Sequence, residues 1–220
     1  MTDITEKSEV DEDSEPLKGV SFGVDSGRSI KGFEVSVFNP EPQYIILDNF
    51  ISQDFAEKLM ELVDKNGVAA EYGGNPNTIE YRVDMSATGN SEDAAVLTAL
   101  HKLFYPFQSI IPQLFRNTAM DFITGNAGFW IMKYDEGGQF TTHVDWSMDG
   151  DKYATQAVAT LCIRLNDEYE GGERELAGKE IGIPLYGGII HDGWTSHKVN
   201  SVTSGSRYVI LTHYTGVLKD

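Results

Sequence analysis

Cysteine is nearly absent from this sequence, since Cys162 is the only one among 220 residues. An intramolecular disulfide is therefore excluded. Because Cys162 lies within the apolar segment 158–163, we expect it to be a small buried hydrophobic side chain. The sequence also lacks any run of about 18 apolar residues, which argues against a membrane-spanning helix. Its N-terminus is acidic and has no apolar signal-peptide segment, so we expect a soluble protein of the cytoplasm.

Positive charge is scarce as well. The chain has 17 lysines and arginines against 34 aspartates and glutamates, which gives a formal net charge of -17. Residues 1–16 hold seven acidic residues and one lysine, so the remainder of the chain is also acidic. An acidic surface repels nucleic acid phosphates and anionic lipid headgroups. We therefore expect neither nucleic acid nor a membrane as a partner, and no pattern indicates the oligomeric state.

The chain divides into three predicted parts. Residues 1–16 are polar, acidic and without periodicity, which is typical of a disordered tail. Residues 17–43 form an irregular N-terminal extension with one strand-like alternation at 33–38. Residues 44–220 have the length and apolar content of a single folded domain.

Helical patterns come first in this domain and strand patterns follow. A strand at 44–50 precedes a helix that begins after Ser52 and ends at Gly67, and further helices are predicted at 91–104 and 105–115. From Gly128 onward, short apolar segments alternate with turns. They predict strands at 129–134, 139–145, 157–166, 180–185, 188–191, 197–199 and 207–214. The expected fold class is α+β with a β-sandwich core.

Three residues form the strongest candidate site. His143 and Asp145 are two residues apart on a predicted strand, so their side chains point to the same face. His197 lies near a later strand and supplies a third metal ligand if the two strands are neighbours. Two imidazoles and one carboxylate on one face of a metal leave open positions, which is the arrangement of non-haem Fe(II) oxygenases. The His-x-Asp pair alone is a weak signal.

Arg207 and Tyr134 accompany these residues. Arg207 opens an apolar strand ten residues after His197, and Tyr134 precedes His143 by nine. Arg207 either pairs with a carboxylate of the chain or remains in solvent, or it binds a ligand carboxylate in a bidentate manner. Tyr134 is either a core side chain or a hydroxyl donor to the same carboxylate.

The order Tyr134, His143-Val144-Asp145, His197 and Arg207 resembles the prolyl 4-hydroxylase-like branch of the Fe(II)- and 2-oxoglutarate-dependent dioxygenases. The turn at 165–173, the segment 204–208 and the strand and helix at 44–62 resemble corresponding pieces of that family. The resemblance extends over residues 44–215. Each motif is weak by itself, and their combined spacing is specific.

The resemblance implies a double-stranded β-helix, or jelly roll, flanked by N-terminal helices. It implies iron bound by His143, Asp145 and His197, with 2-oxoglutarate bound by Arg207 and Tyr134. Catalysis would be centred on the metal, with no separate acid or base and with ascorbate as a supporting reductant. The expected reaction hydroxylates a C–H bond, foremost of a prolyl residue in a peptide or protein, and releases succinate and CO2.

The chain departs from the family pattern at two positions. Arg207 stands where collagen-type relatives commonly carry lysine, which bears on the subfamily rather than on activity. His213 stands where relatives often carry tryptophan, and we expect it to pack or to form a hydrogen bond. His191 is expected to be structural. The intact Asp145 argues against halogenase chemistry.

Substrate contacts are the least defined part of the prediction. Trp146, Trp194, Tyr81 and Arg82 are candidate residues of a substrate groove, and core packing is the alternative for the aromatic ones. The loop 146–156 either folds over the substrate or is an ordinary connection. Free amino acids and other small molecules are alternative substrates. A non-catalytic metal-binding β-sandwich is an alternative of another class, and so is a purely structural protein.

Overall fold

The structure is a computed structural model that describes residues 34–38, 44–70, 77–89, 91–114, 120–146 and 157–218. The predicted tail at 1–16, most of the extension at 17–43 and the loop after Trp146 lie outside these ranges. So does the segment 71–76, between β3 and β4. The division into tail, extension and domain therefore stays a prediction.

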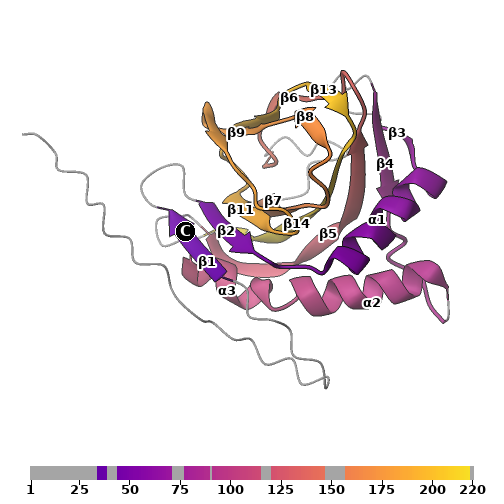
Figure 1. Cartoon of the computed structure of the whole chain (residues 1–220). Coiled ribbons are helices and arrows are strands. Elements are labelled where there is room, and N and C mark those ends of the chain that lie inside the picture. The colour runs from indigo at the N-terminus through magenta and orange to yellow at the C-terminus, as the bar shows by residue number, and fades with distance from the viewer. Residues whose placement is uncertain are drawn as a thin grey trace, which may run out of the picture.

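Two antiparallel sheets form the body of the molecule, and the helices lie outside the larger one (Figure 1). The larger sheet has the strand order β1-β2-β11-β7-β14-β5-β4-β3, the smaller one has the order β10-β9-β12-β6, and β13 pairs with β8. The strands of the larger sheet are β1 (Glu34–Phe38), β2 (Tyr44–Asp48), β3 (Val68–Ala69), β4 (Thr78–Arg82), β5 (Met120–Tyr134), β7 (Ala157–Arg164), β11 (Gly188–Asp192) and β14 (Arg207–Leu218). The others are β6 (Phe140–His143), β8 (Tyr169–Gly171), β9 (Arg174–Leu176), β10 (Lys179–Ile181), β12 (His197–Val199) and β13 (Val202–Gly205).

Three helices cover the outer face of the larger sheet. Helix α1 (Gln53–Asn66) begins at Ser52, whose hydroxyl accepts the backbone N–H of Phe55 at 3.3 Å, and ends at Gly67 as predicted. Helix α2 (Glu92–Phe104) has the same kind of cap at Ser91, and α3 (Phe107–Leu114) follows after Pro106. Their apolar faces pack on the sheet in one continuous hydrophobic cluster.

The central strands alternate between two buried environments. On β14, Ile210 and Tyr214 belong to the cluster beneath the helices, whereas Val209 belongs to a second cluster between the two sheets. On β7, Leu161 and Cys162 divide in the same way. Because both faces of β7 are covered, its residues 157–163 are all buried, which accounts for a run that is apolar except for Thr160. Cys162 is 1% exposed, as expected.

The predicted α+β class with a jelly-roll core is confirmed, and some strand boundaries differ. The segment expected as one strand at 180–185 forms a strand only to Ile181, and a turn around Pro184 follows. Strand β5 begins at Met120, well before its predicted start, because it pairs along β14. The alternation at 33–38 is strand β1, which pairs with β2, so the sheet includes part of the predicted extension.

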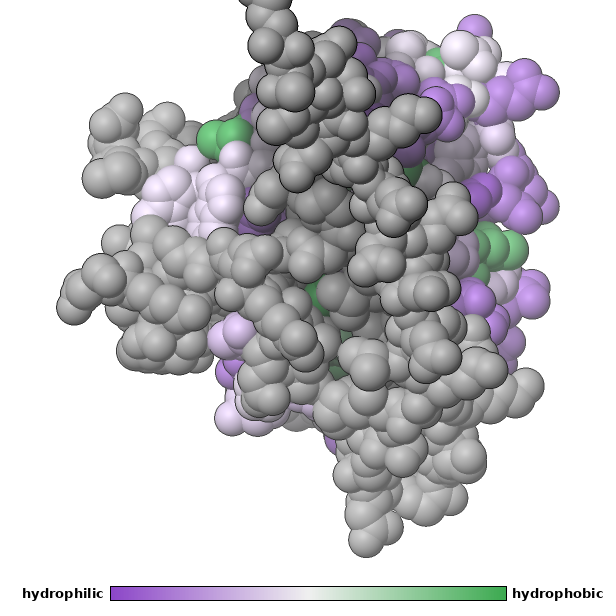
Figure 2. All heavy atoms as spheres, turned by 90° about the vertical axis from the view of Figure 1, so that its left-hand side faces the viewer, coloured by the Kyte–Doolittle hydropathy of each residue, from purple (hydrophilic) through white to green (hydrophobic). Residues whose placement is uncertain are grey.

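The described surface carries few large hydrophobic side chains. In Figure 2, hydrophobic residues of the described part form small separate spots among hydrophilic ones. The most exposed large hydrophobic residues are Val68, Met85, Tyr105 and Val144. Within the described ranges, no helix is long and apolar enough to cross a membrane.

Candidate active site

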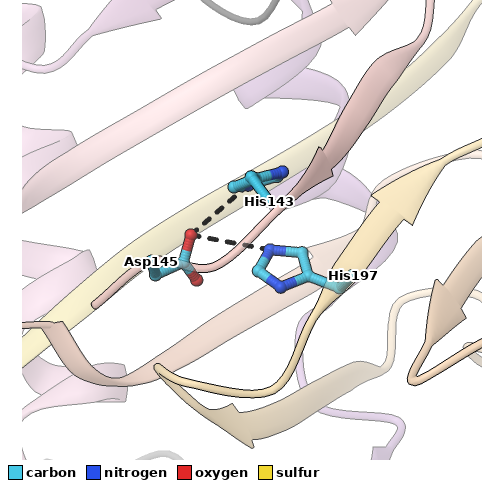
Figure 3. A group of neighbouring side chains, drawn as sticks. All are labelled: His143, Asp145 and His197. Atoms are coloured by element: carbon cyan, nitrogen blue, oxygen red, sulfur yellow. Dashed lines mark ion pairs between the residues drawn. The ribbon is translucent and has the colours of Figure 1, made fainter. Parts of the chain in front are cut away.

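His143, Asp145 and His197 meet at one point between the two sheets (Figure 3). His143 ends β6, Asp145 follows it, and His197 begins β12, where it pairs directly with His143. The Nε2 atoms of His143 and His197 lie 3.4 and 3.5 Å from the same oxygen, Oδ1 of Asp145. One potential ligand atom of each residue lies within 4.8 Å of those of the other two. This geometry fits a single metal ion.

Hydrogen bonds of the two imidazoles leave Nε2 available to the metal. Nδ1 of His143 lies 2.7 Å from the carbonyl oxygen of Thr141, and Nδ1 of His197 lies 2.9 Å from that of Thr195. A carbonyl oxygen only accepts, so Nδ1 of each ring carries the proton and donates it. The lone pair of each neutral imidazole is then on Nε2, next to Asp145. Such backbone bonds orient metal-binding histidines.

Two consecutive hydrogen bonds link the Asp145 carboxylate to Thr160 and Thr160 to His213. The Thr160 hydroxyl lies 2.5 Å from Oδ2 of Asp145 and 2.9 Å from Nδ1 of His213. The hydroxyl donates its one proton to the carboxylate and accepts Nδ1–H of His213. This bond occupies Oδ2 and leaves Oδ1 toward the two metal-binding imidazoles. His213 thus has the hydrogen-bonding role that the sequence suggested.

The backbone of Asp145 is also fixed. The carbonyl oxygen of Gly193 accepts the N–H groups of Asp145 and Trp146 at 2.9 and 2.8 Å. A Cβ atom on Gly193 would lie 1.6 Å from the Ala157 carbonyl oxygen, so only glycine fits this close approach. The turn between β11 and β12 therefore fixes the backbone of Asp145 through Gly193, and it leads directly into β12, which begins with His197.

The electrostatics favour the metal-binding protonation states. Burial raises the pKa of the Asp145 carboxyl, but the neighbouring His213, His143 and His197 outweigh it and hold the pKa well below its usual value. Burial lowers the pKa of His197, and the positive charge of Arg174 lowers it further. The site therefore offers one carboxylate and neutral imidazole at neutral pH.

A cavity of about 310 Å³ opens beside these three residues. The large aromatic and apolar side chains that line it include Trp130, Met132, Phe140 and Leu211. Tyr134 lines it as well, and its hydroxyl contacts only the sulfur of Met132, at 3.5 Å, among the bonds that the structure describes. Burial raises the pKa of Tyr134 to about 12, so this hydroxyl is a hydrogen-bond donor. A mostly apolar cavity with a few convergent polar groups is typical of small-molecule sites.

Arg207 lies on the inner face of β14 and is 2% exposed. It pairs across the sheet with Tyr134, and its guanidinium carbon lies 5.1 Å from the centre of the Tyr134 ring. Its Nη1 is buried without a hydrogen-bond partner. Arg207 itself is not among the lining residues, whereas its neighbour Tyr134 is. Both remain predicted cosubstrate-binding residues.

The predicted groove residues are dispersed. Arg82 lines the cavity and lies over the ring of Trp130, at 5.0 Å from its centre. The Tyr81 hydroxyl instead bonds to Asp93 at 2.7 Å. Trp146 and Trp194 pack against the core with ring centres 6.4 Å apart. Contact with a substrate stays a prediction for all four.

Sequence reasoning missed Thr160 and Arg174, which both line the cavity. Thr160 lies in the apolar run of β7, where a threonine among buried neighbours was a usable signal for an inward polar group. Arg174 follows an acidic, glycine-containing turn, a pattern that is typical of solvent-exposed charge. Only the pairing of β9 with β12 reveals that Arg174 is buried.

Replacing Thr160 with valine is expected to weaken metal binding about 10- to 100-fold, because Asp145 loses the donor that orients it. The measurement is titration of the metal-free protein with Mn²⁺ or Co²⁺. The matched control is Thr212→Val on β14, since that buried hydroxyl bonds to the Gly128 carbonyl beneath the helices. Equal metal affinities of the two variants would contradict the role of Thr160.

The metal-free protein is expected to lose stability as the pH falls below about 6.5. Burial lowers the pKa of His191, His197 and His213 in the folded state, from a usual value of 6.5. Below that value the unfolded chain binds more protons than the folded one, so the free energy of unfolding decreases. Urea unfolding at a series of pH values measures this slope. His191→Gln should reduce this slope, and a flat profile would refute the expectation.

Comparison with curated sequences finds hydroxylases. The chain is 23% identical over 179 residues to prolyl 4-hydroxylase 5 of Arabidopsis thaliana, covering 79% of this chain and 54% of that protein. It is 38% identical over 90 residues to a PKHD-type hydroxylase of Colwellia psychrerythraea, covering 38% of this chain and 40% of that protein. The chain thus spans about half the length, or less, of these relatives. No family model matches the sequence.

Solved structures show the same fold. A prolyl hydroxylase of Trichoplax adhaerens, in complex with a hypoxia inducible factor peptide fragment, matches with a TM-score of 0.62 at 15% identity. The match covers 80% of this chain and 84% of that one. A viral collagen prolyl hydroxylase from Paramecium bursaria Chlorella virus-1, in complex with 2OG, matches with a TM-score of 0.58 at 17% identity, over 79% and 96%. These comparisons confirm the resemblance read from the sequence: the chain is a relative of the prolyl 4-hydroxylases and PKHD-type hydroxylases and has the fold of the 2-oxoglutarate- and Fe(II)-dependent oxygenases.

Proposed function

We propose that this chain is an Fe(II)- and 2-oxoglutarate-dependent hydroxylase that acts on a prolyl residue of a peptide or protein. The observation that carries the proposal is the convergence of His143, Asp145 and His197 in the wall of a cavity that is also lined by the buried Tyr134 and Arg174. The names of the relatives support the reaction class. The peptide complex of the Trichoplax neighbour supports a peptide substrate.

The three residues fit iron by the chemistry of their donor atoms. Two neutral imidazoles and a carboxylate on one side of a metal are the ligand set of non-haem Fe(II) oxygenases. Bound iron, with 2-oxoglutarate and oxygen, would supply the oxidising power for C–H hydroxylation, with succinate and CO2 as co-products. The protein would contribute orientation and a dry cavity, and no side chain is assigned as a separate acid or base.

Arg207 and Tyr134 would bind a carboxylate of 2-oxoglutarate. The Nη1 atom of Arg207 has no hydrogen-bond partner, and the Tyr134 hydroxyl has only a weak sulfur acceptor. A buried guanidinium is unfavourable unless an anion compensates it. A dicarboxylate entering from the iron side would provide that anion.

The substrate would lie over the mouth of the cavity. Trp130 and the 46%-exposed Val144 form apolar walls next to the metal-binding residues, and they suit a proline ring. The side chain of Arg82 lies over Trp130 and adds a hydrogen-bonding group for a peptide backbone.

The test is incubation of the protein with Fe(II), 2-oxoglutarate, ascorbate and a panel of proline-containing peptides. We expect succinate formation and a mass gain of one oxygen atom on proline, with His143→Ala as the background. Oxygen incorporation only into free amino acids would replace the peptide substrate by a small molecule. A protein that binds iron but never forms succinate would overturn the proposal in favour of a metal-binding module.

A further inference from the structure

Among the residues that the structure describes, two arginines are buried, and only one of them lines the cavity. Arg174 is 6% exposed and Arg207 is 2% exposed. The Nε atom of Arg174 and the Nη1 atom of Arg207 are buried and make no hydrogen bond. Arg174 lines the cavity together with the three candidate metal ligands, whereas Arg207 does not line it and lies next to the Tyr134 ring. Of these two buried guanidinium groups, only that of Arg174 therefore borders the cavity, and the other arginine of the lining, Arg82, is exposed.

The backbone places Arg174 next to the metal-binding residues. Strand β9 pairs with β12 so that Leu176 lies opposite His197 and Arg174 lies opposite Val199. Opposite residues of an antiparallel pair point to the same face, and so do residues two apart on one strand. Arg174 therefore lies on the same inner face of the sheet as His197, opposite a residue two positions further along β12.

A hydrogen bond to His191 already occupies one edge of the Arg174 guanidinium. Its Nη2 atom lies 2.5 Å from Nε2 of His191, whose Nδ1 atom lies 2.7 Å from the carbonyl oxygen of Asp192. Nδ1 of His191 therefore donates to Asp192, and Nε2 accepts from Arg174. The His191 ring also lies 4.6 Å, centre to centre, from the ring of His197. The side chain is fixed before any ligand arrives, and its unpaired Nε–H remains.

We propose that Arg174 is a second carboxylate-binding residue, an inference that rests on the proposed function. Arg174 binds the 2-oxoglutarate carboxylate that is next to the keto group and lies beside the metal. Arg207 and Tyr134 bind the distant carboxylate. The cavity then recognises the two ends of 2-oxoglutarate with two different guanidinium groups. Charge-assisted bonds to a carboxylate are among the stronger hydrogen bonds in proteins.

The two roles differ in the ligands they affect. A 2-oxo acid without a distant carboxylate, such as pyruvate, would still contact Arg174 but not Arg207. Arg174→Leu should therefore weaken the binding of both 2-oxoglutarate and pyruvate, by about 10- to 100-fold. Arg207→Leu should weaken 2-oxoglutarate and leave pyruvate unchanged. Arg174→Lys, which keeps the charge, should recover part of the affinity.

The experiment measures binding of each acid to the Mn²⁺-loaded protein by calorimetry under anaerobic conditions, without turnover. The matched control is Arg164→Leu, because Arg164 bonds to the backbone of Asn166 and Ile183 and does not line the cavity. Melting temperatures without ligand are recorded for each variant. Arg174→Leu should keep the melting temperature of the wild type or exceed it, since an uncompensated buried charge is removed.

Wild-type affinity for both acids in Arg174→Leu would overturn this inference and leave the proposed function intact. An affinity loss of equal size in Arg164→Leu would also overturn the inference, because a purely structural effect would then explain the losses in both variants. If the wild-type protein with metal binds neither acid, the proposed function fails together with the inference. The comparison of pyruvate with 2-oxoglutarate thus separates the two claims.

Discussion

Replacing His197 with alanine is expected to abolish turnover and to weaken metal binding by more than about 100-fold. Removal of a residue that merely orients a ligand already weakens binding by about 10- to 100-fold, and His197 would be a ligand itself. The side chain is 3% exposed, and its Nε2 lies 3.5 Å from Oδ1 of Asp145. The variant would leave one imidazole and one carboxylate, which hold iron poorly.

The measurement combines metal titration with succinate formation. His101→Ala is the matched control, because His101 is an exposed residue of α2 whose ring contacts Phe129 and does not line the cavity. We expect the control to bind metal as the wild type does. Unchanged metal affinity in His197→Ala would show that the three residues do not form the metal site.

Replacing Arg207 with leucine is expected to raise the dissociation constant of 2-oxoglutarate by about 30-fold or more. Loss of one partner of a buried charge pair typically costs at least about 2 kcal/mol, which corresponds to that ratio. Leucine is apolar and removes the buried charge, so the free protein should remain folded. Binding to the Mn²⁺-loaded protein measures the effect without turnover.

Arg207→Lys is the informative companion variant. Lysine keeps the charge but cannot form two parallel bonds to one carboxylate, so we expect an intermediate affinity. Arg164→Leu again serves as the control for loss of an arginine outside the cavity. If Arg207→Leu bound 2-oxoglutarate as tightly as the wild type, the ligand would depend on other groups, with Arg174 as the first alternative.

Local signals and motif spacing in the sequence were sufficient to predict the helices and to select His143, Asp145 and His197, the group that could hold a metal ion. Ser52, Ser91 and Gly67 limit helices by hydrogen bonds within a few residues, so their roles can be read from neighbouring positions. His143 and Asp145 share a strand end, and the family spacing led to His197. These predictions depend on short-range geometry or on a motif.

Non-local pairing explains what could not be predicted. The first half of β5 has glycine and asparagine and forms a strand because β14 pairs with it over a long sequence separation. Arg174 has acidic neighbours in sequence, and its burial depends on a partner strand more than twenty residues later. The contact of His191 with Arg174 likewise depends on the pairing of distant strands and could not be read from the sequence.

The alternation along β14 ties the site to the rest of the fold. Its even-numbered residues Ile210 and Tyr214 pack under the helices, while Leu211 and His213 line the cavity. A one-residue slip of this strand against β5 or β7 would exchange the two sets, placing isoleucine beside the candidate metal ligands and histidine in the hydrophobic cluster beneath the helices. We therefore expect a one-residue insertion or deletion between Arg207 and Thr212, where the pairing of β14 with β5 is regular, to disrupt the cavity and the hydrophobic cluster together.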